Sequence, residues 1–200
     1  MNKPNLLFPT PVWTLQVDNY KILNEGMYNY IKKAQIEDQK GITKSNIKGW
    51  HSKNFNLKDT EPKKFISAIL PSIEKVMIDM NWDRERQTIR ISNMWSIINT
   101  GGSTNSKHQH GNCTISGAYY VRAPKNCGDI VFYDPRPAPV FYYPTALSSN
   151  FLNAQVNGIT PKEGALILFP SYLDHSVNEN LSDGERIVIS FNIKIQIDTN

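Results

Sequence analysis

Three of the four histidines in this chain of 200 residues have the spacing of a metal site. His108 and His110 are two residues apart, and His175 follows 65 residues after His110. If the first two lie on a strand, their side chains project from the same face, because side chains alternate across a strand. A third imidazole from a distant strand would complete one triangular face of a metal ion. Such a set, with Arg186 beside it to hold a carboxylate, has the outline of a non-haem iron(II) site.

Arg186 begins the last apolar run of the chain, eleven residues after His175. If residues 181–184 form the turn of a hairpin, His175 lies opposite Ser190, and alternate residues from 186 to 190 share its face. Positions 186 and 190 are then roughly 13 Å apart at about 3.3 Å per residue, so a long arginine and a multi-carbon diacid together would bridge them. A planar guanidinium pairs well with a carboxylate. A surface arginine paired with Glu185 or Glu179 is the alternative.

The second half of the chain predicts the strands that must position these residues. From residue 88 onward, short runs rich in Ile, Val, Tyr and Phe are separated by clusters of Gly, Pro, Asn and Asp. Short apolar runs separated by turn-forming residues favour an antiparallel sandwich or barrel, with the histidines at strand ends near its mouth. Strands are expected at residues 88–98, 113–122, 129–133, 165–169 and 186–197.

The N-terminal part predicts helices that pack against this sheet. After an extended opening over residues 6–17, residues 19–39 favour a polar helix, and a second helix is expected to be capped by Thr60. Pro71 should kink or interrupt the second helix, and residues 41–58 should form a loop. The expected inward-facing side chains are Ile22, Met27, Tyr30, Ile31 and Ala34 in the first helix, and Phe65, Ile69, Ile73, Val76, Met77 and Met80 in the second.

The expected fold class is mainly β with N-terminal helices, as one domain over residues 1–200. Residues 1–87 would form a helical buttress and loops, and residues 88–197 a double-stranded β-helix, the jelly roll that cupins share. An apolar content of 40% in 200 residues is enough for one sizeable core.

The composition indicates which classes of binding partner and which cellular compartment to expect. A net charge of +4 with scattered lysines and arginines indicates an ordinary solvated surface, so no nucleic-acid groove is expected. Cys113 and Cys127 are too few for a disulfide framework, which favours a reducing compartment. No apolar stretch approaches the roughly 18 to 20 residues of a membrane span. A cytoplasmic protein without a membrane partner is expected, and a homodimer is compatible with the sequence.

Short segments along nearly the whole chain carry a likeness to a known family. They are LFPTPVW near the start, GWHS at 49–52, NMWSIIN at 93–99, HQH at 108–110, SGAYYV at 116–121, FYDPRP at 132–137, EGALILFPSYLDHSV at 163–177 and ERIVISFNI at 185–193. Together they resemble the iron(II)- and 2-oxoglutarate-dependent oxygenases with a prolyl-hydroxylase-like double-stranded β-helix. The similarity is greatest to small oxygenases of marine bacteria and their phages.

This resemblance implies Fe(II) and 2-oxoglutarate as cofactors. His108 and His175 would bind the metal, and Arg186 would anchor the distal carboxylate of 2-oxoglutarate. Val188 replaces the first serine of the arginine strand, which leaves Ser190 as the hydroxyl partner of the oxoacid.

His110 stands where the wider superfamily usually has Asp or Glu. Three neutral imidazoles would leave the site at +2 before the cosubstrate binds, which a dianionic oxoacid tolerates. The alternative third ligand is Asp134, because Asp174 adjoins His175 and would point to the opposite face of a strand. We favour His110 and keep Asp134 open.

Aromatic residues near the histidines have two interpretations each. Tyr119 or Tyr120 would touch the cosubstrate, and parity permits only one of them to face inward. Trp95 is expected mainly to pack in the core.

The resemblance implies oxidative decarboxylation of 2-oxoglutarate by O2 to succinate and CO2, coupled to hydroxylation of a protein side chain or a small molecule. Trp50, His51 and Lys53 lie in a loop that could cover the barrel mouth, and the segment 135–157, with Arg136, is either a lid or a solvated loop.

Two other functions remain open from the sequence. A cupin-type metal enzyme would work without an oxoacid, but residues 111–116 lack the glutamate that cupins place after the histidine pair. A non-catalytic jelly-roll module, for example of a virion, would bind no metal.

Overall fold

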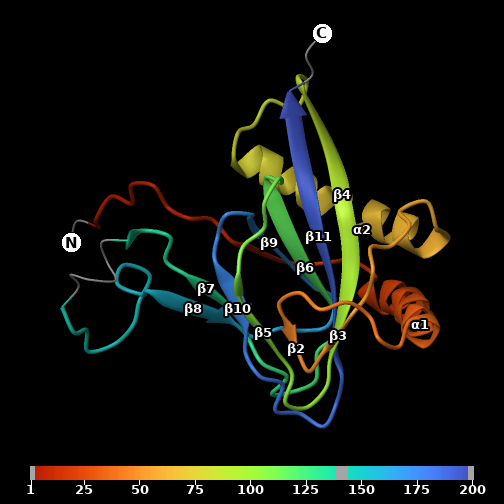
Figure 1. The fold of residues 1–200 in the computed structure, drawn as a ribbon. Coiled ribbons are helices and arrows are strands. Elements are labelled where there is room, and N and C mark those ends of the chain that lie inside the picture. The colour runs from red at the N-terminus through yellow and green to blue at the C-terminus, as the bar shows by residue number, and fades with distance from the viewer. Residues whose placement is uncertain (1–2, 138–143, 198–200) are drawn as a thin grey trace.

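Two antiparallel sheets form the centre of the computed structural model, which describes residues 3–137 and 144–197 (Figure 1). The larger sheet has the order β1-β9-β6-β11-β4-β3, and the smaller sheet has the order β2-β5-β10-β7-β8. The strands are β1 Trp13–Gln16, β2 Asn46–Ile47, β3 Trp50–His51, β4 Gln87–Asn99, β5 Thr104–His108, β6 Ile115–Arg122, β7 Ile130–Tyr133, β8 Val156–Ile159, β9 Ala165–Pro170, β10 His175–Val177 and β11 Arg186–Ile197.

Two helices, α1 Tyr20–Glu37 and α2 Thr60–Asp79, cover one face of the larger sheet (Figure 1). Phe65 of α2 is fully buried, with its ring centre 5.1 Å from that of Tyr119 and 5.9 Å from that of Phe191. Met27 and Ile31 of α1 join the same core. The predicted class, mainly β with N-terminal helices and a jelly-roll arrangement, is therefore confirmed. No helix of the described residues is long and apolar enough to cross a membrane.

Several details of the predicted helices are wrong. Ile22 is 77% exposed, because the inward stripe of Met27 and Ile31 continues at Leu23, four residues before Met27. Met80 follows the end of α2 and is 38% exposed. Asp59, and not Thr60, occupies the N-cap position, and α2 continues through Pro71 without interruption.

The long apolar strands were predicted within about two residues, whereas the short polar ones were missed. Strands β5 and β10 have one β-branched residue each, β8 is only four residues long and contains Gly158, and β2 and β3 fall within the expected loop 41–58. Pairing with neighbours, not intrinsic propensity, places such strands in a sheet.

The expected hairpin between His175 and Arg186 is wrong. Strand β10 pairs with β5 and β7 in the smaller sheet, while β11 pairs with β4 and β6 in the larger one. Ser190 therefore lies opposite Trp95 and Ala118, and not opposite His175. The chain crosses between sheets in this segment, where the Asn180 side chain donates hydrogen bonds to the carbonyls of Asn99 and Gly184, both at 2.8 Å. His175 and Arg186 consequently face a shared interior from opposite sheets.

Candidate metal and anion site

The three clustered histidines come from two neighbouring strands and the segment after one of them. His108 ends β5 and lies directly opposite His175, the first residue of β10. His110 lies beyond β5, where its backbone N–H donates to the Ser171 carbonyl at 2.9 Å. One ligand nitrogen from each ring lies within 4.8 Å of the others. In the described part of the chain, they form the one group of three or more His, Cys, Asp or Glu residues able to hold a metal.

Backbone carbonyls orient two of these rings. Nδ1 of His108 lies 2.7 Å from the Ser106 carbonyl, and Nδ1 of His175 lies 3.0 Å from the Leu173 carbonyl. Since a carbonyl only accepts, Nδ1 carries the proton in both rings and Nε2 keeps its lone pair. Such a hydrogen bond to the far nitrogen is the usual way in which proteins orient a metal-binding histidine.

Burial keeps the three imidazoles neutral. It lowers the pKa of His110 to about 4 and that of His175 to about 3, and it also lowers the pKa of His108. Metal ions bind the neutral form of histidine. The cluster is therefore ready to bind a cation without first releasing protons at neutral pH.

These pKa shifts predict that the metal-free protein loses stability as pH falls from 6.5 toward about 4. In the unfolded chain the histidines regain the ordinary pKa of 6.5, so over this range the unfolded state binds more protons than the folded state, and the free energy of unfolding decreases. Urea unfolding at several pH values should show a smaller decrease for the double variant His110→Gln/His175→Gln. An equal decrease in both proteins would contradict the burial of neutral imidazoles.

Arg186 extends into the same interior from the start of β11 and is 1% exposed. Its Nη1 donates hydrogen bonds to the carbonyls of Cys127, of Gly128 at 3.1 Å and of Asn178 at 3.3 Å. Its Nη2 is buried without a partner among the described residues. A buried guanidinium nitrogen left free in this way is suited to an anionic oxygen. The alternative of a surface arginine is wrong, since Glu185 pairs with Lys32 instead.

A pocket of about 840 Å³ between the sheets contains both the histidines and the arginine. Alternate residues of β11 line it, as the shared face of positions 186, 188 and 190 predicted. The pocket lining also includes Lys44, His51, Lys53, Trp95, Asn99, Asn105, Tyr120 and Ser190.

The structure separates the two tyrosines of β6. Tyr120 lines the pocket, whereas Tyr119 points to the helical side, where its hydroxyl donates to Asn24 Oδ1 at 2.6 Å. Tyr119 is therefore a wrong candidate for cosubstrate contact, because strand parity turns it into the core with Phe65. Burial raises the pKa of Tyr120, so its hydroxyl is protonated and can donate.

Asp134 is not placed with the histidines. Its carboxylate pairs with Arg136 at 2.8 Å, and that pairing, through the side-chain hydrogen bond, holds the pKa of Asp134 below its ordinary value. Asp174 pairs with Lys107 at 3.0 Å. Neither acid lines the pocket.

The expected loop residues are divided between the pocket and the core. His51 and Lys53 line the pocket, while Trp50 is partly buried against the core cluster and donates its Nε1–H to the Asp38 carbonyl at 2.8 Å. Of the expected lid, residues 138–143 lie outside the described residues, and Val156 already begins β8.

Sequence reasoning missed polar residues that share the pocket. Asn99 donates to Asn105 at 2.9 Å, and its own Oδ1 is buried without a partner in the described chain. Asn99 follows Trp95 by four residues on β4, so strand alternation could have found it. Lys44, before β2, had no such signal.

Comparison with known proteins places this geometry in a family. Residues 93–192 match the model of the family described as "Putative 2OG-Fe(II) oxygenase". No curated protein matches the sequence.

Solved structures with the same fold include a Pseudomonas putida prolyl-4-hydroxylase, with a TM-score of 0.63, 10% identity, and 92% of each chain covered. A viral collagen prolyl hydroxylase from Paramecium Bursaria Chlorella virus-1, in complex with 2OG, has a TM-score of 0.59, 14% identity, and coverage of 91% of this chain and 94% of that one. HygX from Streptomyces hygroscopicus, with nickel and 2-oxoglutarate bound, has a TM-score of 0.60, 8% identity, and coverage of 92% and 83%. At these identities the likeness concerns the fold.

Proposed function

Because the chain belongs to the 2OG-Fe(II) oxygenase family, we propose that His108, His110 and His175 hold its Fe(II) and that Arg186 binds the distal carboxylate of 2-oxoglutarate. The observation that carries this assignment is the free, buried Nη2 of Arg186 in the pocket that also contains the three histidines. The residues fit both groups, since neutral imidazoles suit Fe(II) and a guanidinium suits a carboxylate.

When bound, Fe(II) and 2-oxoglutarate supply oxidative decarboxylation of the oxoacid to succinate and CO2, coupled to hydroxylation of a substrate C–H bond. The protein's own residues orient these partners. Tyr120 and Ser190 line the pocket on the same sheet as Arg186, and we assign their hydroxyls to the cosubstrate. Phe169 and Ile130 contribute apolar walls that limit water around the reacting groups.

The free guanidinium nitrogen favours this function over a cupin-type enzyme that uses no oxoacid, because such an enzyme has no need for a buried anion anchor. The clustered imidazoles favour it over a non-catalytic module. The primary substrate is a protein side chain or a small molecule. Both kinds occur among the similar structures, one described as a collagen prolyl hydroxylase and another as HygX with hygromycin B bound.

Position 110 offers a direct test of the metal ligands. We expect His110→Ala to weaken Fe(II) binding by about 100-fold, because one of three ligands is lost. His110→Asp should retain binding and succinate formation, because a carboxylate is the common third ligand in this type of site. The measurements are Fe(II) equilibrium dialysis and succinate release from 2-oxoglutarate under air.

The control is His51→Gln, which alters the one histidine outside the cluster and should leave Fe(II) affinity unchanged. Unchanged Fe(II) affinity in His110→Ala would show that His110 is a neighbour of the metal and not a ligand.

We also propose that the protein acts in the cytoplasm, where its two free cysteines, Cys113 and Cys127, would stay reduced.

A further inference from the structure

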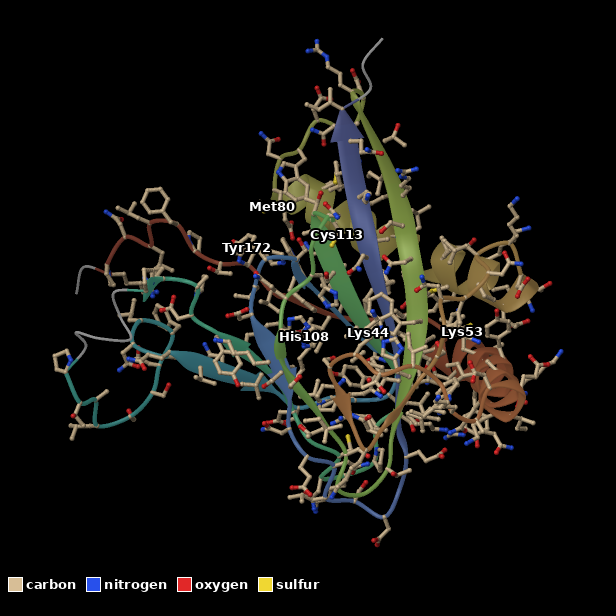
Figure 2. All side chains as sticks on the ribbon, viewed as in Figure 1. Lys44, Lys53, Met80, His108, Cys113 and Tyr172 are labelled. Carbon is tan, nitrogen blue, oxygen red and sulfur yellow. The ribbon has the colours of Figure 1, made fainter. Side chains whose placement is uncertain are left out.

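The wall of the pocket outside the histidines carries positive charge. Besides Arg186, its lining includes Lys44 and Lys53, and it includes no Asp or Glu from residues 3–137 and 144–197. In the view of Figure 2, Lys44 lies between His108 and Lys53. The proposed metal and cosubstrate account for Arg186 and the histidines, but not for the lysines.

The two lysines differ in their partners. Lys53 lies 3.0 Å from a carboxylate oxygen of Asp38, which offsets its charge. Lys44 makes no ion pair with any residue that the structure describes. Its backbone N–H is held by Asn46 Oδ1 at 2.8 Å, which fixes the main chain and leaves the ammonium group free. Of the two lysines, Lys44 is therefore the one whose charge no described acidic residue offsets.

Side chains that line the pocket lead from Lys44 toward the three histidines. Lys44 and His51 line the same pocket, and burial together with the charge of Lys44 lowers the pKa of His51. The ring of His51 stacks on Trp95, with centres 5.8 Å apart and planes 7° apart. Trp95 in turn lies 5.8 Å from the ring of His110. A ligand held by Lys44 would thus extend along these rings toward the histidines.

Two polar atoms on this path have no hydrogen-bond partner among the residues that the structure describes. Trp95 is 8% exposed, and its Nε1–H is buried without a partner among the described residues. Nδ1 of His51 lies 2.7 Å from the Ser52 carbonyl, so Nδ1 carries the proton and Nε2 can accept. An indole N–H can only donate, which suits an oxygen of the bound molecule. These atoms point to a ligand beyond the cosubstrate.

The sum of the charges in the pocket indicates whether that ligand is an anion or a cation. This step rests on the proposed function, because it counts Fe²⁺ and 2-oxoglutarate. Fe²⁺, three neutral imidazoles and Arg186 sum to +3, and 2-oxoglutarate contributes −2, which leaves +1. Lys44 raises this excess to +2, because Asp38 already offsets Lys53. A carboxylate at position 110 would have lowered the excess by one. Excess positive charge in a pocket attracts an anion, and Lys44 adds to that charge from an exposed position at its edge.

We propose that the primary substrate carries an acid group, a carboxylate or a phosphate, which Lys44 binds at the pocket mouth while the remainder of the molecule lies along His51 and Trp95.

Small probes test this without knowledge of the substrate. The protein is loaded with Mn(II) and 2-oxoglutarate without oxygen, and the paramagnetic relaxation of methyl protons is measured for acetate, methyl phosphate and neutral acetamide. At least one acid should relax about threefold faster than acetamide, the scale of one exposed ion pair. The acid that responds distinguishes a carboxylate substrate from a phosphate substrate. Lys44→Gln should reduce the enhancement to that of acetamide.

The control variant is Lys58→Gln, which removes an exposed lysine outside the pocket lining and should leave the enhancement unchanged. Equal relaxation of acids and acetamide would overturn the proposal. So would an enhancement that persists in Lys44→Gln, since the anion would then bind the metal itself. The absorption band of Fe(II) with 2-oxoglutarate, recorded on the same proteins, distinguishes a failure of this inference from a failure of the proposed function. If the band forms without anion preference, only this inference fails; without the band, the proposed function fails as well.

Discussion

The substitution His175→Ala is expected to abolish Fe(II) binding at micromolar concentrations and all succinate formation, while the fold persists. His175 is the most buried of the three proposed ligands, at 4% exposed, and its Nδ1–H bond to Leu173 presets the ring for a metal. Loss of one ligand should cost about 100-fold in affinity. Fe(II) equilibrium dialysis and a succinate assay measure both effects.

The stability of the fold must be measured separately, because the His175 ring also packs against Phe169, with 4.7 Å between the ring centres. Removing it leaves a cavity, with an expected loss of about 2 kcal/mol in the free energy of unfolding. His175→Gln fills more of that space and should be equally inactive. Full turnover in either variant, with His51→Gln as the matched control for metal affinity, would remove His175 from the proposed site.

The substitution Arg186→Lys is expected to raise the concentration of 2-oxoglutarate required for half-maximal succinate formation by about 100-fold. Lysine keeps the charge but loses the planar pair of donors, of which Nη1 is held by backbone carbonyls and Nη2 is free for the cosubstrate. Each lost charge-assisted hydrogen bond contributes roughly 1.5 to 3 kcal/mol. Fe(II) affinity without cosubstrate should change little, because Arg186 lies outside the histidine cluster.

Arg122→Lys serves as the control, since Arg122 lies on the neighbouring strand, is largely exposed and pairs with Glu163. It should leave the 2-oxoglutarate requirement unchanged. If Arg186→Lys did the same, the oxoacid would have to bind elsewhere, and the free Nη2 would need another explanation.

The fold was predictable where the sequence has strong periodicity. Strands β4, β6, β9 and β11 carry long apolar or alternating runs, and α2 has a clear amphipathic stripe, so their existence followed from local pattern. Which strand belongs to which sheet did not follow from the local pattern. The crossing between Val177 and Arg186 depends on buried hydrogen bonds such as that of Asn180 with Asn99, which no local pattern encodes.

The candidate site shows the same division. The three histidines and the arginine were selected by residue type and spacing, and the structure brings their side chains into one pocket. The structure brings these side chains together in another way than the expected shared strand and hairpin. His110 lies beyond the end of β5, and His175 faces Arg186 from the other sheet. Parity limited the choice to Tyr119 or Tyr120, but only the position of the helices decides which face of β6 is covered.

The most direct test of the account is an anaerobic titration of the purified protein with Fe(II) and 2-oxoglutarate, followed by visible absorption. We predict a weak metal-to-ligand charge-transfer band that requires both additions, persists in His51→Gln and is lost in His175→Ala. Bound Fe(II) without any such band would contradict the assignment of Arg186 and the pocket to 2-oxoglutarate, and a lack of Fe(II) binding would contradict the three-histidine site itself.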